Sequence, residues 1–202
     1  EFTANNYNAA GRVCDVVKPE EVQAVVDGTV AKFGSVDILI NNAGVSWGAM
    51  PEDMPLDRWK QVLDVNLTGC FLFAQAAGRQ MLKQGSGSII NIASIAGITS
   101  SANGPFYAGY VASKAGLIGL TRELAASWGR KGIRVNAIAP GFFHSRLADA
   151  VIDLYETSIQ ENNVIPRVGE EGELKGITVF LASDASSYIT GQTIAVDGGM
   201  SV

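Results

Sequence analysis

The stretch "VDILINNAG" (residues 36–44) joins an apolar run to a turn made of two asparagines, an alanine and a glycine. Short apolar runs bounded by turn residues are typical of buried strands. The same pattern returns in "SIINIAS" (88–94), "IRVNAIAPG" (133–141) and "TIAVDGG" (193–199). An earlier and shorter run, "RVCDV" (12–16), also predicts a strand. The chain is therefore expected to build a sheet from short strands.

Amphipathic segments separate these runs. The spacing of apolar residues predicts helices over 18–34, with Pro19 in the first turn and Gly34 at the end, over 55–82, over 105–128 and near 171–183. A looser segment runs to about Arg167. This alternation predicts an α/β fold with a doubly wound parallel sheet and helices on both faces. With 202 residues, 47% of them hydrophobic, the chain is expected to form a single domain, 1–202.

Composition narrows the function. The net charge of -5 argues against a nucleic-acid partner or an anionic membrane, because both require a basic surface. No apolar run reaches the roughly 18 residues that a membrane span needs. Cys14 and Cys70 lie far apart and lack metal-ligand spacing, so we expect reduced thiols, no metal site and a cytoplasmic protein. A small-molecule substrate fits these features best.

The candidate catalytic residues lie at or shortly after the end of a predicted strand. Ligands of doubly wound sheets bind beyond the carboxyl ends of the strands. Ser94 ends one predicted strand, and Tyr110 and Lys114 follow one helical turn apart. A nearby ammonium favours an ionised phenol, which would make Tyr110 a usable acid and base. The Tyr-x-x-x-Lys spacing alone is weak evidence, because it also occurs on solvated helix faces.

Taken together and in order, the motifs resemble those of the short-chain dehydrogenase/reductase family. The matching elements are "CDV" (14–16), "NNAG" (41–44), "VNLTGCF" (65–71), "INIAS" (90–94), "YVASK" (110–114), "IRVNAIAPG" (133–141) and "GQTIAVDGG" (191–199). The resemblance implies a Rossmann-like fold, NAD or NADP as cofactor, and interconversion of a ketone and a secondary alcohol by hydride transfer.

The resemblance also implies catalytic roles. Tyr110 would be the acid and base, and Lys114 would lower its pKa while holding the nicotinamide ribose. Ser94 would orient the substrate oxygen, and Asn66 would hold a water that links Lys114 to solvent. Tyr107 is a rival for Tyr110, but the residue four positions after it is Val111, which cannot stabilise a phenolate.

For the cofactor, the resemblance implies contacts from several turns. Asp15 and Val16 would lie near the adenine, and Asn42, Ala43 and Gly44 near its ribose. Pro140 and Gly141 would lie beside the nicotinamide, and Ser145 would bind the carboxamide in place of the usual threonine. Structural alternatives remain open: Asn41 and Asn42 could cap a turn, Asp15 could begin the next helix, and "VDGG" could be a tight turn.

Other residues near these turns are less specific. His144 is the one histidine, and we interpret it as solvated or packed rather than catalytic. Trp47, Phe142, Phe143 and Arg146 flank the turns as candidates for shaping the substrate site, although a surface ion pair is the simpler reading of Arg146. The loop 95–106, with Gly104 and Pro105 before the helix, is predicted to bulge over the substrate.

The substrate is left open. "NNAGVSWGA" and "APGFFHSRL" look like members that act on 3-oxoacyl chains, whereas the segment from Pro166 to Gly199 looks like gluconate dehydrogenases. The resemblance further implies a homotetramer or homodimer built on the helices over 55–82 and 105–128 and on the last strand. The alternative is a non-catalytic chain that serves as a structural partner, against which the intact Ser94, Tyr110 and Lys114 speak.

The family's order of strands is 3-2-1-4-5-6-7, and its N-terminal βαβα portion, with the glycine-rich turn that holds the pyrophosphate, is absent from this sequence. We interpret the sequence as part of a longer enzyme or a shortened version of one, rather than a natural short form. The predicted strand 12–16 would then lack a neighbour for its hydrogen bonds.

Overall fold

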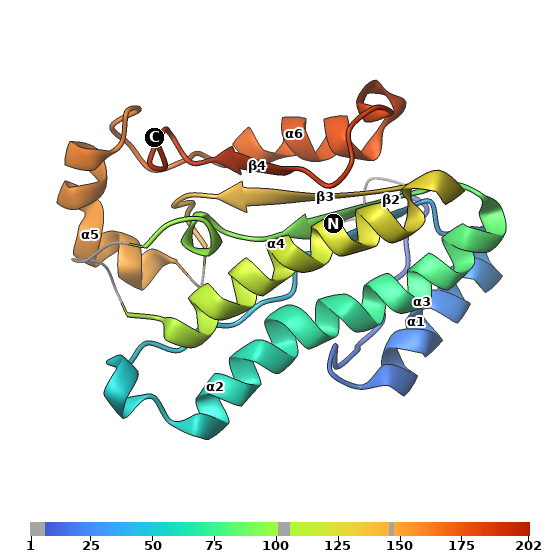
Figure 1. The fold of residues 1–202 in the computed structure, drawn as a ribbon, viewed down its shortest axis with the longest axis horizontal. Helices are drawn as coiled ribbons and strands as arrows, with labels where there is room; N and C mark the ends of the chain where they lie inside the picture. The colour runs from blue at the N-terminus through green and yellow to red at the C-terminus, as the bar shows by residue number, and fades with distance from the viewer. Residues whose placement is uncertain (1–6, 101–105, 146–147) are drawn as a thin grey trace.

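The computed structural model describes residues 7–100, 106–145 and 148–202. Its sheet has four parallel strands in the order β1-β2-β3-β4, and their arrowheads point to the same end of the molecule (Figure 1). The strands are β1 (Ile38–Asn41), β2 (Gly87–Ile92), β3 (Ile133–Pro140) and β4 (Thr193–Val196). This order corresponds to the 4-5-6-7 part of the expected sheet. The turns after β1, β2 and β3 therefore lie side by side at one edge.

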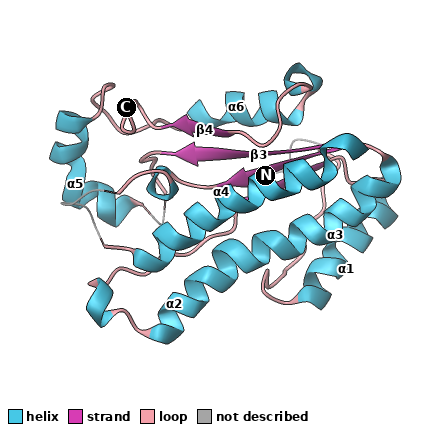
Figure 2. Cartoon of the chain, viewed as in Figure 1, coloured by secondary structure: helices cyan, strands magenta, loops and turns pink. Residues whose placement is uncertain are grey.

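Helices cover both faces of the sheet, as predicted (Figure 2). One face carries α3 (Gly69–Gln84) and α4 (Ala108–Trp128), with α1 (Pro19–Phe33) packed on α3 and α2 (Leu56–Leu63) on α4. The other face carries α6 (Glu173–Ala182). Neighbouring residues of β2 supply both cores: Ile89 packs with Met81 of α3, and Ile90 packs with Leu181 of α6.

The predicted helix over 55–82 is interrupted. Between α2 and α3, residues Asp64–Thr68 form a π-helical turn, and the helix continues to Gln84. One extra residue in such a turn rotates the following side chains, and π-turns occur frequently at functional sites. The buried residue of this turn is Asn66, which is fully inaccessible to solvent.

Two predictions of secondary structure are wrong. Residues 12–16 form no strand, because no described strand lies beside them to complete the ladder of hydrogen bonds. The segment expected to be loose contains helix α5 (Asp149–Asn162), which buries Ile152 and Ile159 on one side. The start of α4 and the ends of the strands differ from the predicted limits by a few residues, whereas β1 is shorter than predicted at both ends.

Strand β1 is less buried than predicted. Ile38 and Ile40 are 47% and 46% exposed, although their partners on β2 are covered by α6. Within the described residues, β1 lies at the edge of the sheet and no helix covers this side of it. The apolar pattern that predicted a buried strand is therefore only half satisfied.

A chain of buried amides crosses the opposite face of the sheet, which α3 and α4 cover. Asn41 of β1 donates from Nδ2 to Oδ1 of Asn91 on β2 at 2.9 Å, and Asn91 donates to Oγ1 of Thr121 on α4 at 2.9 Å. Asn41 also donates to the carbonyl of Cys70 at 3.2 Å. Buried amides in apolar strands need such partners, and here they fix β1 to β2 in register and hold α4 against both.

The turn between α4 and β3 provides a test of the packing. Gly132 has φ +83°, and a Cβ there would collide with the carbonyl oxygen of Gly85. We expect Gly132→Ala to lower the free energy of unfolding by about 2 kcal/mol or more, because strain and collision add. Gly119→Ala in α4 is the matched control: nothing lies within 4 Å of its added Cβ, so helix propensity should raise stability by about 0.5–1 kcal/mol. Denaturant unfolding of both variants measures this, and similar effects would refute it.

Candidate active site

Asn66 ties the turn after β1 to helix α4. Its Oδ1 accepts from the backbone nitrogen of Val45 at 2.8 Å, and its Nδ2 donates to the carbonyl of Val45 at 2.9 Å and to Oγ of Ser113 at 3.0 Å. Ser113 in turn donates to the carbonyl of Tyr110 at 2.7 Å. The "NNAG" turn and the first turn of α4 are thereby held in one position. The predicted water held by Asn66 stays a prediction.

Ser94 and Tyr110 meet beyond the end of β2. Ser94 is buried, has extended backbone angles and caps the short 3₁₀ turn Ile95–Gly97, where its Oγ accepts from the nitrogen of Ala96 at 3.2 Å. Tyr110 is half-buried in the first turn of α4 and hydrogen-bonds with Ser94. The sequence thus brings a hydroxyl and a phenol to one point, as predicted from the strand end and the helix that follows.

Lys114 reaches the same place from the next turn of α4. Its side chain is 4% exposed, and Nζ donates to the carbonyl of Ile92, the last residue of β2, at 2.7 Å. Nζ lies 5.6 Å from the centroid of the Tyr110 ring. A Cβ on Gly44 would lie 3.8 Å from Nζ, so the ammonium also borders the "NNAG" turn.

The pKa of Tyr110 departs from the prediction. Burial raises it above the ordinary value, and the hydrogen bond with Ser94 acts against this shift without reversing it. Burial also lowers the pKa of Lys114. The expected lowering of the Tyr110 pKa by Lys114 is absent, because the ammonium points to the Ile92 carbonyl rather than to the phenol oxygen. In the folded chain burial therefore disfavours ionisation of the phenol.

A hollow of about 240 Å³ opens beside the end of β1. The residues that line it include three of those predicted near the adenine and its ribose: Val16, Asn42 and Ala43. Gly69 lies at its base, where a Cβ would come within 2.8 Å of the Val16 side chain. The other two predicted residues, Asp15 and Gly44, do not line the hollow, and Gly44 borders Lys114 instead.

Asp15 and Ser145 have local partners. The Asp15 carboxylate accepts from the nitrogen of Val17 at 3.2 Å, in the turn before α1, which agrees with its alternative role as a helix start. Ser145 Oγ accepts from the nitrogen of Ala148 at 3.2 Å, before α5. Both are exposed to solvent, so these bonds can be exchanged for bonds to a ligand.

Gly141 follows Pro140 at the end of β3 and has a packing reason to be glycine. Its nitrogen donates to the carbonyl of Val196 at 2.9 Å, and a Cβ would lie 2.8 Å from the Cα of Asp197. The "VDGG" sequence is the tight turn that the alternative reading described: Gly198 and Gly199 both have positive φ, and Asp197 accepts from the nitrogen of Gly199.

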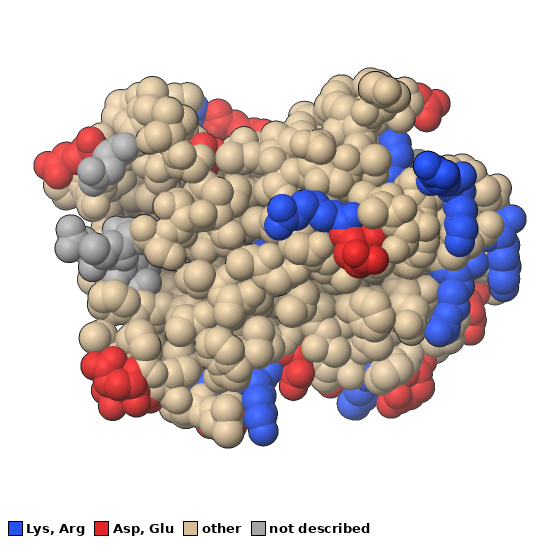
Figure 3. All heavy atoms as spheres, in the orientation of Figure 1, with Lys and Arg blue, Asp and Glu red and all other residues tan. Residues whose placement is uncertain are grey.

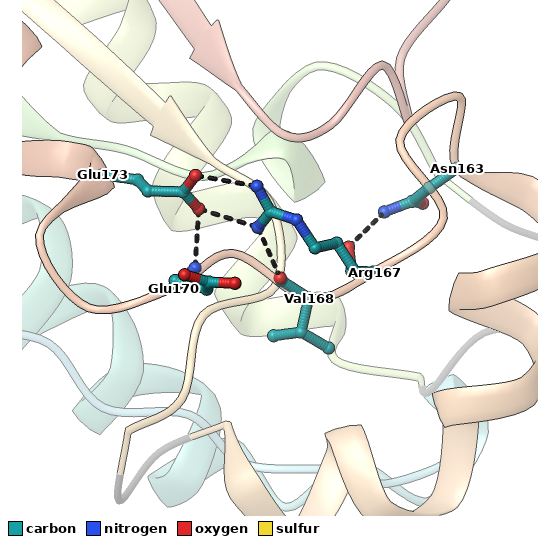
Figure 4. A network of polar contacts seen from close by, with 5 residues as sticks. All are labelled: Asn163, Arg167, Val168, Glu170 and Glu173. Atoms are coloured by element: carbon teal, nitrogen blue, oxygen red, sulfur yellow. Dashed lines mark hydrogen bonds and ion pairs between the residues drawn. The ribbon is translucent and has the colours of Figure 1, made fainter.

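A second hollow, also of about 240 Å³, lies behind this turn, and Phe142 and Phe143 line it. Its wall is fixed by a paired contact between Arg167 and Glu173 at 2.8 and 2.9 Å (Figure 4). Arg167 and the nitrogen of Glu170 lower the pKa of Glu173 to about 2. The two phenylalanines thus support the turn from behind.

Other candidates lie apart from Lys114. His144 is exposed, and its Nδ1 lies 3.1 Å from the carboxylate of Asp149, which agrees with a solvated role. Tyr107 precedes α4 and places its ring against Gly48, and burial raises its pKa. Arg146 and the 101–105 part of the predicted bulging loop lie outside the described residues.

Comparison with known proteins shows which family has this sequence and fold. Residues 1–201 match the family model described as enoyl-(acyl carrier protein) reductase. A short-chain type dehydrogenase/reductase from Mycobacterium marinum is 36% identical, with a TM-score of 0.94 over 98% of this chain and 78% of the other. The chain belongs to the short-chain dehydrogenase/reductase family.

Two further relatives of this family illustrate its range. The 3-oxoacyl-(acyl-carrier-protein) reductase of Staphylococcus aureus is 40% identical over 200 residues, which is 99% of this chain and 80% of that protein. A gluconate 5-dehydrogenase from Burkholderia cenocepacia, solved with NADP and tartrate, is 37% identical, with a TM-score of 0.94 over 99% of this chain and 78% of the other.

The chain is accordingly an oxidoreductase that uses NAD or NADP to interconvert a ketone and a secondary alcohol. Three of the residues predicted to contact the adenosine half of such a cofactor, Val16, Asn42 and Ala43, line the hollow at β1. The comparisons give no support to the non-catalytic alternative, since these relatives are named as dehydrogenases and reductases.

Sequence reasoning missed the residues that hold the site together. Asn91 and Ser113 lie within the motifs "INIAS" and "YVASK" but were given no role, and Thr121 lies outside the motifs; all three connect the strand ends to α4. The available signal was an asparagine inside the apolar strand "SIINIAS", because such an amide needs a buried partner.

No helix in the described part of the chain is long and apolar enough to span a membrane.

A substitution of Lys114 tests whether its hydrogen bond to the Ile92 carbonyl compensates for the cost of burying its charge. Because burial disfavours its charge, we expect Lys114→Met to keep the free energy of unfolding within about 1 kcal/mol of the wild-type value, or raise it, at pH 7. Its folded pKa lies below the unfolded pKa, so wild-type stability relative to the variant should rise as pH rises toward about 10. Denaturant unfolding at several pH values measures this.

The matched control is Lys83→Met, at an exposed position in the last turn of α3. The difference in free energy of unfolding between Lys83→Met and the wild type should stay constant as pH rises toward about 10. A loss above about 2 kcal/mol for Lys114→Met at pH 7 would mean that the bond to Ile92 outweighs burial.

Proposed function

We propose that Tyr110 is the proton donor and acceptor of the reaction, with Ser94 and Lys114 as its partners. The observation that carries this proposal is the meeting of the three side chains at the carboxyl end of β2. When bound, the dinucleotide supplies a hydride to a ketone or accepts one from an alcohol. Tyr110 gives its proton to the carbonyl oxygen, and Ser94 donates a hydrogen bond to that same oxygen.

Lys114 would hold the nicotinamide ribose and stabilise the phenolate left after proton transfer. Its position next to Gly44 supports this, because the "NNAG" turn leads from the β1 hollow to its ammonium. Asn66 would hold a water that connects Lys114 with solvent. We assign Asp15, Val16, Asn42, Ala43 and Gly44 to the adenosine side of the cofactor, and Pro140, Gly141 and Ser145 to its nicotinamide side.

The acid form of Tyr110 favours ketone reduction near neutral pH. A phenol whose pKa is raised by burial stays protonated and can donate, whereas the oxidation of an alcohol needs the scarcer phenolate. The S. aureus and B. cenocepacia relatives are named for 3-oxoacyl and gluconate chemistry, so both types of substrate are candidates here.

We also propose that residues 1–202 form one domain of a cytoplasmic homotetramer or homodimer. Its two described cysteines are free thiols, which suits a reducing compartment. Exposed apolar side chains on the expected interface elements support assembly: Leu56 of α2 is 65% exposed and Phe71 of α3 is 40% exposed.

The proton-transfer role predicts the effect of removing one oxygen. Tyr110→Phe should lower kcat by about 10²–10⁴-fold, because only the acidic hydroxyl is lost. Cofactor binding and thermal unfolding should remain near wild type. Tyr107→Phe removes the same atom three residues away and should keep turnover within about tenfold. Comparable losses in both variants, or a near-normal rate for Tyr110→Phe, would contradict the assignment.

The direction of the pKa shift predicts a pH profile. Because burial raises the pKa of Tyr110, ketone reduction should lose no activity through tyrosine ionisation until above pH ~10, whereas alcohol oxidation should increase with pH over the same range. Steady-state rates in both directions from pH 6 to 10.5 measure this. A tyrosine-dependent decline of reduction near pH 7 would show that the bound cofactor reverses the shift.

A further inference from the structure

An apolar rim stands beside the proposed proton donor. Trp47, Met50 and Phe106 are 40%, 45% and 44% exposed. Their segments are joined by a hydrogen bond from the nitrogen of Ala49 to the carbonyl of Phe106 at 3.1 Å. The rim adjoins Tyr107, whose ring lies against Gly48, and therefore the first turn of α4 that carries Tyr110.

Helix α5 brings negative charge to the same end of the molecule. It lies beyond the arrowheads of the strands (Figure 1), and Tyr155 interacts electrostatically with Tyr107. Its sequence, "DAVIDLYETSIQEN", has four acidic residues and no lysine or arginine. Asp149, Asp153 and Glu156 follow helical spacing along one side, and Asp149 contacts His144 in the turn after β3.

The rim continues directly into further acids. Glu52 and Asp53 follow Met50 in the 3₁₀ turn Pro51–Asp53, and both are exposed. The nearby cation Arg58 is already engaged, with its guanidinium 4.3 Å from the centroid of the Trp47 ring and 3.6 Å from the Asp57 carboxylate.

In Figure 3 most lysine and arginine atoms lie toward the opposite end of the face, mixed there with acidic atoms, and red atoms lie at the upper and lower corners of the α5 end. Arg146, outside the described residues, adds one positive charge to the sequence between β3 and α5. Among the described residues of these segments, the three acids along α5 and the two in the 3₁₀ turn outnumber the cation Arg58. The end of the molecule that carries the apolar rim therefore has a net negative charge in these segments.

We propose that this site selects a ketone with an apolar body, that a negative charge on that body weakens its use, and that a positive charge strengthens it. This inference rests on the proposed function for the chemistry: a hydride adds to the carbonyl carbon, Tyr110 protonates the oxygen, and the reduced dinucleotide is oxidised. The apolar rim and the charges near it determine which ketone binds. Of the two candidate types of substrate, the gluconate type would bring a charge of the unfavoured sign.

Three ketones of one shape test the selection in the intact enzyme with its cofactor. They are 4-phenyl-2-butanone and its para-carboxylate and para-aminomethyl derivatives. We expect kcat/KM to be at least about tenfold lower for the carboxylate than for the neutral ketone, and equal or higher for the ammonium. Salt should compress the differences, because exposed charges are screened within about 3 Å at 1 M ionic strength.

A charge variant identifies the cause. The double substitution Asp153→Asn/Glu156→Gln should raise kcat/KM for the carboxylate about threefold or more and leave the neutral ketone unchanged. Asp27→Asn, an exposed acid on α1, is the control and should change neither. A carboxylate used as well as the neutral ketone, or a double variant without effect, would overturn the inference.

Binding separates the two proposals. Dissociation constants of the three ketones, measured by calorimetry on the Tyr110→Phe enzyme with bound cofactor, rank them without turnover. The predicted ranking without any wild-type turnover would overturn the proposed function and support the selection. Turnover without charge preference in either measurement would support the function and overturn the selection.

Discussion

The structure of the site depends on one buried amide. Asn66 has no exposed surface, and three hydrogen bonds from its side chain join the backbone of Val45 to Ser113. The π-helical turn aims it inward. Without this connection the turn after β1 and the start of α4 would lose three of the hydrogen bonds that hold them in position. With it, Gly44 stays beside the Lys114 ammonium, at the end of the turn whose first residues line the hollow at β1. A fully bonded buried network is rigid because every broken bond leaves an unsatisfied group.

The sequence predicted the sheet well where apolar runs end in a turn. The runs at 88–94, 133–141 and 193–199 form β2, β3 and β4, and their order follows from the family's topology. It failed at 12–16, because a strand depends on a neighbour that its own residues cannot reveal. Helix α5 was missed although Ile152, Tyr155 and Ile159 show helical spacing, since polar residues and loop-like surroundings hid the pattern. Motif and spacing brought Ser94, Tyr110 and Lys114 together correctly.

The electrostatics of the site could not be predicted from spacing. A tyrosine and a lysine one turn apart suggest an ionised phenol, but the shift depends on how much water reaches each group and on where the ammonium points. In the folded chain Nζ bonds to the Ile92 carbonyl, and burial dominates both pKa values. Both groups are moved toward their neutral forms. Burial is a property of the packed structure, and a local sequence pattern carries little information about it.

Under the proposed roles of Tyr110 and Lys114, these opposing shifts would give Lys114 a role that begins when the proton leaves. While Tyr110 keeps its proton, the phenol has no charge for the ammonium to stabilise, and both groups bear the cost of burial. Transfer of the proton to the substrate creates a phenolate whose ring centroid lies 5.6 Å from Nζ. The attraction between the two charges then favours the ionised form of each. An interaction that strengthens as the reaction proceeds lowers the barrier, whereas one already present in the resting state would not. In the proposed mechanism, Lys114 would therefore contribute more by leaving the resting phenol protonated than by ionising it in advance.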